Sequence, residues 1–268
     1  MATNISDQAA VDPRAQLGDD VEIGPFCMVG PDVTIGAGSR LMNNVTLTGR
    51  VTAGENNQFF PGVVIGADPQ DLSYQGGDTS VQIGDHNVFR EGVTVNRATE
   101  KEDGLTTVGS HCYFMACAHI AHDCRVGSWV VMANATLLGG HVHVHDHATF
   151  SGGAAVHHFA SVGSYSFVSG LSRVLHDVPP YMLVDGVPAR PRCINVVALK
   201  RNDFTSEDIR ALSEAHRVLY RAKVGLDHAR EILRANGNLI PPVNHLLSFV
   251  QTQQEGRHGR ARERRRAA

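Results

Sequence analysis

Apolar residues recur at every sixth position along most of this chain as far as Val174. From Val108 to Val174 every sixth residue is apolar, although only 42% of the chain is hydrophobic. An α-helix repeats about every 3.6 residues, so this spacing makes no apolar stripe on a helix. Short strands separated by corners would instead point one side chain per strand inward. The spacing predicts a β-solenoid in which three six-residue sides close one triangular coil.

The same spacing is present from Val11 to Ile65 and resumes at Ile83, before Val108 continues it one residue late. Glycine follows the apolar residue at many of these positions. Glycine is expected there if the corner needs a positive φ or crowds a neighbouring backbone. Two polar, glycine-containing segments, 67–80 and 98–107, interrupt the repeat. We expect both to be loops that project from a corner, where inserted loops of repeat proteins tend to form binding surfaces.

The repeat ends after Val174, in a segment that contains four prolines between residues 176 and 193. Proline lacks the N–H that a β ladder needs, so we do not expect the ladder to continue there. Thr205–Asp208 resembles a capping box, and the apolar residues that follow have helical spacing. Further helices are expected at about 226–235 and after Pro241-Pro242.

These patterns predict a β-solenoid domain at 1–190, a small helical domain at 191–256 and a basic, disordered tail at 257–268. A net charge of −3 and a pI of about 6.6 give no case for nucleic-acid binding. The N-terminus lacks the apolar region of a secretion signal, and no apolar run is long enough for a transmembrane helix, so neither secretion nor a membrane span is expected. Five cysteines without a C-x-x-C pair suit reduced thiols in a cytoplasm.

Several of the 15 histidines fall on one edge of the predicted solenoid. His122, Gly140 and His158 follow the 18-residue spacing of the coil, so they should form a column with about 4.8 Å between coils. Beside them in sequence stand His119, Asp123, His141 and His157. A histidine next to a carboxylate can act as a general base, and a glycine N–H can approach and stabilise an oxyanion. Adjacent residues need not touch, so the partner of His122 stays open, as does the alternative of a merely exposed polar column.

Three blocks of sequence carry a resemblance to a known family: A-H-I-A-H-D-C-R-V-G at 118–127, N-A-T-L-L-G-G-H-V at 134–142 and G-G-A-A-V-H-H-F-A-S-V-G at 152–163. P-Q-D-L-S-Y at 69–74 and N-V-V-A-L-K-R at 195–201 extend it over nearly the whole chain. They resemble the hexapeptide-repeat UDP-N-acetylglucosamine O-acyltransferases, the family that begins lipid A synthesis.

The resemblance implies a fold, an assembly and a reaction. The fold is a left-handed parallel β-helix, an exception to the usual right-handed crossover, followed by a small helical domain. The assembly is a homotrimer with active sites between subunits. The reaction moves an (R)-3-hydroxyacyl group from acyl carrier protein to the 3-hydroxyl of UDP-N-acetylglucosamine. The acyl carrier protein thioester is then a co-substrate, and neither a cofactor nor a metal is implied.

The resemblance also implies roles for individual residues. The catalytic centre would consist of His122 as general base, Asp123 as its orienting partner and the Gly140 N–H as oxyanion donor. The residues that would contact substrate are Gln70, Asp71, His119, His141, His157, Asn195 and Arg201. Gln70 and Asp71 would contact the sugar or acyl hydroxyl, and the three histidines would line the cleft. Asn195 and Arg201 would lie at the nucleotide end. Gly170 would lie where the acyl tail ends, leaving the groove open to a long chain.

The chain departs from the usual pattern of this family at three positions. The first loop usually reads D-L-K-Y, and here Ser73 replaces the lysine. After Asn195 the pattern often carries an acid and a pair of arginines, and here Val197 and Asn202 stand instead. Charged side chains at the nucleotide and diphosphate end are therefore reduced, whereas the acyl-transfer centre is intact.

Two other functions remain open on the residues alone. One is a metal hydratase resembling the γ-type carbonic anhydrases, since H-V-H-V-H-D-H at 141–147 would place alternate histidines outward. A catalytic zinc needs three protein ligands, whereas alternate residues of one strand are spread about 6–7 Å apart. The other is a non-catalytic trimeric scaffold or a tetrapyrrole- or nucleotide-binding module. Metal content and thiol release from acyl carrier protein would separate these functions.

Overall fold

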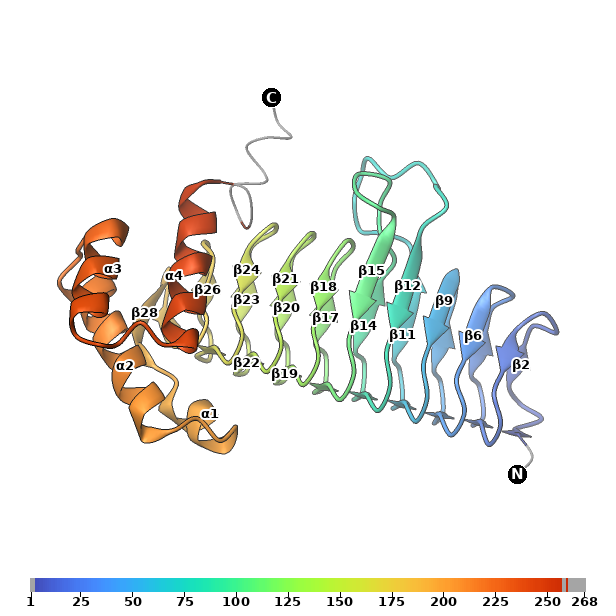
Figure 1. Ribbon diagram of the computed structural model, residues 1–268. Helices are drawn as coiled ribbons and strands as arrows, with labels where there is room; N and C mark the ends of the chain where they lie inside the picture. Colours follow the sequence, from blue (N-terminus) through green and yellow to red (C-terminus); the bar gives the residue numbers. More distant parts are fainter. Residues whose placement is uncertain (1–2, 257–258, 260–268) are drawn as a thin grey trace.

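The computed structural model describes residues 3–256 and residue 259 of the 268-residue chain. The disordered tail predicted at 257–268 therefore lies, apart from Gly259, outside the described residues. The chain forms a long three-sided prism of stacked coils, and helices α1 to α4 lie at its C-terminal end (Figure 1). In this part of the chain, no helix is both long and apolar enough to cross a membrane.

Each side of the prism is a sheet that takes one short strand from each coil. The first sheet contains β1 (Asn4–Ile5), β4 (Glu22–Ile23), β7 (Arg40–Leu41), β10 (Gln58–Phe59), β13 (Val88–Phe89), β16 (Tyr113–Phe114), β19 (Val131–Met132), β22 (Thr149–Phe150), β25 (Phe167–Val168), β27 (Met182–Gly186) and β28 (Ala189–Ile194). The second contains β2 (Ala10–Val11), β5 (Met28–Val29), β8 (Thr46–Leu47), β11 (Val64–Ala67), β14 (Thr94–Asn96), β17 (His119–Ile120), β20 (Leu137–Leu138), β23 (Ala155–Val156) and β26 (Arg173–Val174). The third contains β3 (Gln16–Leu17), β6 (Val33–Ile35), β9 (Arg50–Ala53), β12 (Ser80–Ile83), β15 (Leu105–Val108), β18 (Arg125–Val126), β21 (His143–Val144) and β24 (Ser161–Val162).

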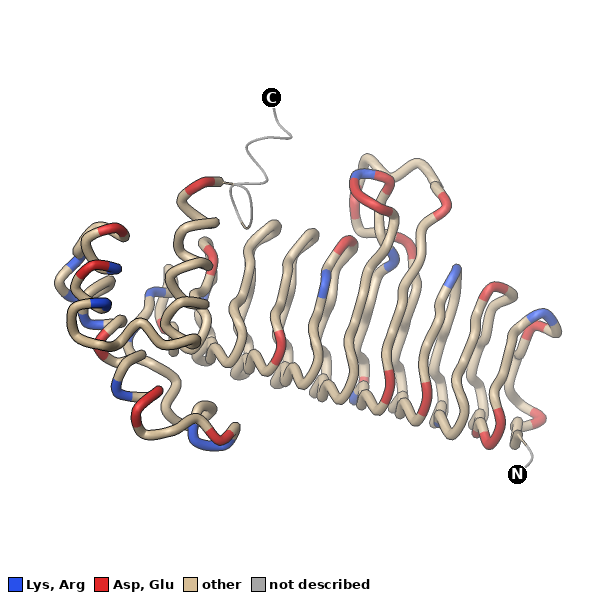
Figure 2. The backbone as a smooth tube through the Cα atoms, viewed as in Figure 1, with Lys and Arg blue, Asp and Glu red and all other residues tan. Residues whose placement is uncertain are grey.

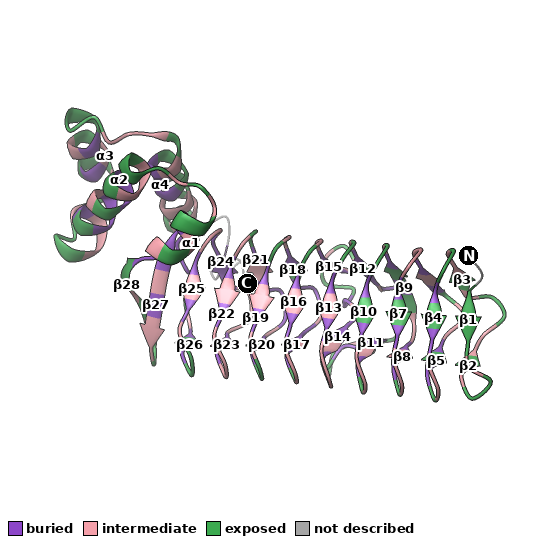
Figure 3. Ribbon diagram, turned by 90° about the horizontal axis from the view of Figure 1, so that it is seen from below, coloured by how far each residue is buried: buried purple, intermediate pink, exposed green. Residues whose placement is uncertain are grey.

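The strand register confirms the predicted 18-residue coil. In the first sheet Phe114 pairs with Met132, which pairs with Phe150, each one full coil further along the chain. All the periodic apolar residues between Val108 and Val174 are buried, and they fill the interior of the prism coil by coil (Figure 3). Full burial of one such side chain contributes on the order of 1.5–3 kcal/mol, so the six-residue spacing supplies the main stabilisation of the solenoid.

The corners explain the glycines of the repeat. Left-handed backbone conformations occur at corners, but mostly in non-glycine residues such as Cys117, Asp123 and Trp129. The glycine that follows the buried residue serves close approach instead: a Cβ on Gly36 would lie 2.5 Å from the backbone carbonyl carbon of Gly54 in the next coil. Of the two reasons expected from the sequence, crowding of the neighbouring backbone is therefore the one that holds at such positions.

Both predicted loops project from the prism. The first loop, residues 68–79, joins β11 to β12, and the second loop, residues 97–104, joins β14 to β15. They leave successive coils at the same corner, between the second and third sheets, and rise together from the prism (Figure 1). The second loop is shorter than predicted because Leu105–Val108 is a strand that pairs with β12 along its full length.

The C-terminal helices are α1 (Val196–Arg201), α2 (Ser206–His216), α3 (Leu226–Ala235) and α4 (Pro241–Gln254), with a π-helical segment η1 (Arg217–Arg221) after α2. Thr205 and Asp208 form the predicted capping box at the start of α2. The prediction that the ladder stops after Val174 is wrong for the first sheet. There β27 continues in parallel with β25, and β28 pairs with β27 antiparallel, with Pro191 on the outermost strand of the sheet, the kind of strand that tolerates proline.

The chain is thus a left-handed parallel β-helix of hexapeptide repeats with a small C-terminal helical region, as predicted. The division into domains at about residue 190 stays a prediction. For function, the important feature is the line of corners between the second and third sheets. It carries the first loop, the second loop, His122, Gly140 and His158 in successive coils, and we call it the histidine edge.

Candidate active site

His122 and Asp123 lie on the histidine edge between β17 and β18. The Nδ1 atom of His122 is 2.7 Å from Oδ2 of Asp123. This contact, left open by the sequence, forms because Asp123 adopts a left-handed conformation, with φ of 59°, that turns its side chain back toward its neighbour. A carboxylate accepts, so Nδ1 carries the hydrogen and Nε2 is left with its lone pair.

The Asp123 carboxylate is itself fixed. It is 1% exposed, and it accepts hydrogen bonds from the N–H of Thr99 at 3.2 Å and from the Thr99 hydroxyl at 2.7 Å. The Asp123 N–H in turn donates to the hydroxyl of Thr106 at 2.9 Å. A carboxylate held by this many donors can orient an imidazole and stabilise its protonated form.

Gly140 stacks directly on His122, as the 18-residue spacing predicts. A Cβ on Gly140 would lie 2.5 Å from Cε1 and 2.7 Å from Nε2 of the His122 ring. Only a residue without a side chain therefore allows the ring to lie here. Within the described part of the chain, the Gly140 N–H donates no backbone hydrogen bond, whereas the N–H groups of Gly139 and His141 on either side both do.

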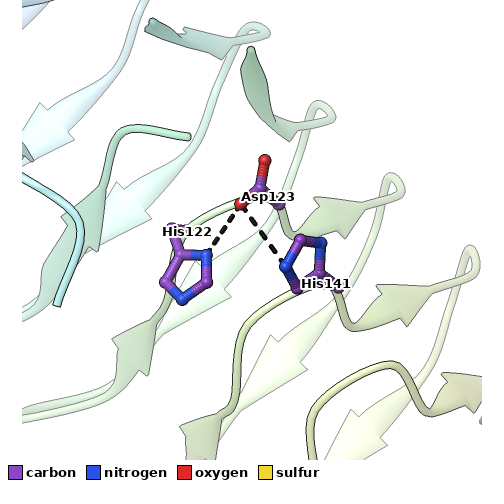
Figure 4. A group of neighbouring side chains, drawn as sticks. All are labelled: His122, Asp123 and His141. Atoms are coloured by element: carbon purple, nitrogen blue, oxygen red, sulfur yellow. Dashed lines mark hydrogen bonds and ion pairs between the residues drawn. The ribbon is translucent and has the colours of Figure 1, made fainter. Parts of the chain in front are cut away.

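His141 is buried between two carboxylates. Its Nε2 lies 3.7 Å from Oδ2 of Asp123 and its Nδ1 lies 3.4 Å from Oε1 of Glu102, while its ring stacks on Phe159. Figure 4 shows the rings of His122 and His141 on either side of the Asp123 carboxylate. The expectation that alternate histidines from His141 onward point outward is wrong for His141, because a left-handed corner turns it into the edge.

Asp71 of the first loop faces the same ring. Its Oδ2 lies 4.0 Å from Nε2 of His122. Its Oδ1 accepts from the N–H and the hydroxyl of Ser73, at 2.8 and 2.7 Å. The hydrogen bond from Lys101 has the largest effect on the pKa of the Asp71 carboxyl, and the two Ser73 donors add to it. Together they hold this pKa well below its ordinary range, so the group is ionised. Gln70 is exposed beside it on the same loop.

The remaining histidines of the predicted cleft also lie on or beside the histidine edge. His119 is on β17, and its Nδ1 lies 2.8 Å from the hydroxyl of Thr94. Burial, with a smaller effect of His122, lowers the pKa of His119, so its imidazole is neutral near pH 7. His157 lies two coils beyond His122, with its ring against that of His158.

Asn195, Arg201 and Gly170 lie elsewhere on the chain. Asn195 and Arg201 line a cavity of about 310 Å³ that also includes Trp129, against the first sheet. The Asn195 side chain caps α1, accepting from the N–H of Ala198 at 3.2 Å, and donates to the carbonyl of Tyr165 at 2.9 Å. Gly170 is exposed at the corner between the first and second sheets. A single chain therefore does not bring these three residues together with His122.

Sequence reasoning missed three residues of the site, namely Thr99, Lys101 and Glu102, all from the second loop. The loop interrupts the repeat, so the 18-residue spacing does not place them on the edge. The sequence feature that could have indicated them is the charged run E-K-E-D at 100–103, because it lies one coil before His122 at the same corner. Figure 2 shows charged residues of both signs gathered on the two projecting loops.

The ligand atoms of His122, Asp123 and His141 lie within 4.8 Å of one another, close enough to hold a metal ion. The set contains two histidines and one carboxylate. The Nδ1 atom of His122 donates to Asp123 and in that state has no lone pair to offer an ion. The arrangement is that of a base and its orienting carboxylate.

Comparisons with known proteins agree on one family. A family model described as UDP N-acetylglucosamine O-acyltransferase, domain 2, matches residues 177–259, and a model of bacterial transferase hexapeptide repeats matches residues 14–49. Relatives named acyl-[acyl-carrier-protein]–UDP-N-acetylglucosamine O-acyltransferase include one from Syntrophobacter fumaroxidans, 44% identical, covering 92% of this chain and 96% of its own. Another, from Synechocystis sp., is 41% identical and covers 80% and 78%.

Solved structures give the same result. The UDP-N-acetylglucosamine acyltransferase from Bacteroides fragilis superposes with a TM-score of 0.90 at 33% identity, covering 95% of this chain and 98% of its own. The enzyme of the same name from Francisella novicida has a TM-score of 0.88 at 37% identity, covering 92% and 91%. The likeness therefore extends over both the prism and the C-terminal helices.

Proposed function

Since the chain belongs to the family of acyl-[acyl-carrier-protein]–UDP-N-acetylglucosamine O-acyltransferases, we propose that it carries out this transfer, the first step of lipid A synthesis, on the histidine edge. The acyl group is an (R)-3-hydroxyacyl chain, and the acceptor is the 3-hydroxyl of UDP-N-acetylglucosamine. The observation that carries the site assignment is His122, oriented by Asp123 on one side and packed against Gly140 on the other. The family supports this acyl transfer over a hydratase or a silent scaffold.

His122 acts as the general base. A sugar hydroxyl is too weak an acid to attack a thioester unless a base takes its proton as the bond forms. The neutral imidazole takes this proton on Nε2, and Asp123 stabilises the resulting imidazolium through Nδ1. As the sugar oxygen bonds to the acyl carbon, the thioester carbonyl becomes an oxyanion, which accepts from the Gly140 N–H. Collapse of this intermediate breaks the C–S bond, and the imidazolium returns its proton to the departing thiolate.

These steps need a base, an oxyanion donor and an activated acyl group. The chain supplies the first two and the thioester of acyl carrier protein supplies the third, so we propose no additional cofactor. Asp71 and Gln70 of the first loop would contact the sugar or acyl hydroxyl, and His119, His141 and His157 would line the cleft. The five cysteines are free thiols, which supports our placement of the enzyme in a reducing cytoplasm.

The nucleotide would bind away from the histidine edge of the same chain. Arg201 lies in the last turn of α1 and lines the cavity against the first sheet. Asn195 is the N-cap of this helix and would act chiefly by positioning it, because its side chain accepts from the N–H of Ala198. This cavity lies against the first sheet, whereas His122 lies at the corner between the second and third sheets, and this separation supports a site shared between neighbouring subunits.

We therefore expect a homotrimer. Exposed apolar side chains on or near the second sheet, among them Met28, Leu137 and Leu171, are 58%, 47% and 78% exposed in the isolated chain, and a closed threefold ring would cover such surface. Sedimentation velocity of the 28.9 kDa chain at micromolar concentration should give a single species of three times that mass. A stable monomer that retains full transfer activity would contradict a site between subunits.

The reaction is tested by mass spectrometry of its products. The purified protein is incubated with UDP-N-acetylglucosamine and acyl carrier proteins that carry (R)-3-hydroxyacyl chains of graded length. We expect one acyl group per sugar, on the 3-oxygen, with release of one free thiol per product. The 3-amino analogue of the sugar serves as the competing acceptor. Absence of acylated sugar with every donor would overturn the proposed function.

The same donor series tests the role of Gly170. A Cβ at this exposed position would make only ordinary contacts, at 3.4 Å, with the carbonyl oxygen of Gly152 and the hydroxyl of Ser151, so the fold does not require glycine here, and its lack of a side chain leaves the corner uncovered. We propose that the end of the acyl chain passes here. Long donors should then be used at least as well as short ones. Use of short donors alone would show that the tail ends before this corner.

A further inference from the structure

Lys101 and Glu102, adjacent residues of the second loop, contact the residues on either side of His122 and Asp123, which we call the catalytic pair. The Nζ atom of Lys101 lies 2.5 Å from Oδ2 of Asp71, and Oε1 of Glu102 lies 3.4 Å from Nδ1 of His141. Asp71 in turn faces His122, and His141 faces Asp123. The result is a continuous row of charged and titratable groups: Lys101, Asp71, His122, Asp123, His141 and Glu102.

The Lys101 end restrains Asp71. Ser73 holds Oδ1 of this carboxylate from within the first loop, and Lys101 holds Oδ2 from the second loop. The carboxylate is left with little freedom to rotate and remains directed at Nε2 of His122. This chain has Ser73 where the family pattern D-L-K-Y has a lysine, and the cation that contacts Asp71 comes from the second loop.

The Glu102 end restrains His141. The two side chains are only 12% and 5% exposed, so the Glu102 carboxylate sits against the imidazole largely away from water. Glu102 lies 3.4 Å from Nδ1 of this ring and Asp123 lies 3.7 Å from Nε2, so rotation of the ring would move it away from at least one of the two carboxylates. The His141 ring therefore packs beside Asp123 on the side opposite His122. The centroids of the His122 and His141 rings are 5.2 Å apart.

We propose that Lys101 and Glu102 are positioning residues for acyl transfer: the second loop aligns His122 and Asp123 by holding Asp71 at one end and His141 at the other. The inference rests on the proposed function, in which His122 is the base. Neither residue touches the reacting atoms. Each acts through the side chain that it holds: Lys101 joins the second loop to the first, and Glu102 joins the second loop to the corner that carries His141.

The test compares Lys101→Met, Glu102→Gln and Asp103→Asn, three consecutive positions of one loop. Asp103 is the matched control, because it pairs with Arg125 on the outside of the loop, where both side chains are about half exposed, and such pairs contribute little. A displacement of about 1 Å at a reacting group can cost on the order of 100-fold in rate. We expect kcat/KM to fall about 10–100-fold in the first two variants and less than about twofold in the control.

Two further measurements separate positioning from general loss of structure. Glu102→Gln should lower kcat while leaving KM for the UDP-sugar nearly unchanged, because it acts on the catalytic pair. Lys101→Met should raise KM as well, because Asp71 also faces substrate. Lys101→Arg, which keeps a cation at Asp71, should retain most of the activity that Lys101→Met loses.

Wild-type transfer activity is measured alongside, so that failure of the proposed function is seen separately as an inactive wild type. With an active wild type, unchanged kcat/KM in Lys101→Met and Glu102→Gln would overturn the positioning role. Equal losses in Asp103→Asn, or an equal loss in Lys101→Arg and Lys101→Met, would overturn it too, since the loop would then act only as a folded unit.

Discussion

Replacement of His122 by alanine should lower kcat about 10²–10⁴-fold, the usual contribution of general-base catalysis, and leave KM for the UDP-sugar within a few-fold. The base is needed in the transition state, when the sugar hydroxyl gives up its proton, and contributes little to binding the ground state. Steady-state kinetics with a saturating acyl carrier protein thioester measure both constants. The variant should fold normally, because His122 lies on a corner outside the buried column of the prism.

His111→Ala provides the control for loss of a histidine. His111 lies on another edge of the prism, stacked between His86 and Trp129, so its removal should leave kcat unchanged. Full activity in His122→Ala would remove His122 from the mechanism. Loss of a stoichiometric zinc ion together with activity would point instead to a metal hydratase. Circular dichroism and sedimentation of both variants confirm that the assembly is intact.

Gly140→Ala should lower kcat about 10²-fold or more without unfolding the protein. The added Cβ would lie 2.5 Å from the His122 ring, and the ring is the part that can move. Moving it breaks the hydrogen bond between Nδ1 and Asp123 or turns Nε2 away from the substrate. The N–H of residue 140 is retained in this variant, so its loss of activity measures displacement of the base rather than loss of the oxyanion donor.

Gly30→Ala is the matched glycine control. Gly30 lies in an early coil, and its added Cβ would meet nothing closer than 3.5 Å, so neither fold nor rate should change. Thermal melts of the two variants should agree within a few degrees. Retention of more than half of wild-type kcat in Gly140→Ala would show that His122 does not need its observed position, which would weaken its assignment as the base.

The sequence predicts the solenoid and much of the site because the length of one coil, 18 residues, determines both. It places the buried residues from Val108 to Val174 in the interior, and it stacks Gly140 on His122. Both expectations are confirmed. The repeat also locates the corner from which the two loops project, because the loops interrupt it at equivalent points of successive coils.

The repeat could not predict contacts that depend on a local backbone conformation. Asp123 reaches its neighbour, and His141 turns inward, only because each takes a left-handed φ that no spacing reveals. The contacts of Lys101 and Glu102 were missed for a related reason, since a loop outside the repeat has no register. The strand β28 was missed because its proline argues against a ladder, although an edge strand tolerates it.

The stacked construction of the prism has an evolutionary consequence. Each coil packs only against the coils before and after it, so a substitution is felt mainly by its immediate neighbours. The cavity that contains Val197 and Asn202 and the histidine edge can therefore accumulate changes independently of each other. This separation lets the proposed nucleotide end carry Val197 and Asn202, where the family pattern often has charged residues, without a change in the A-H-I-A-H-D block that holds His122.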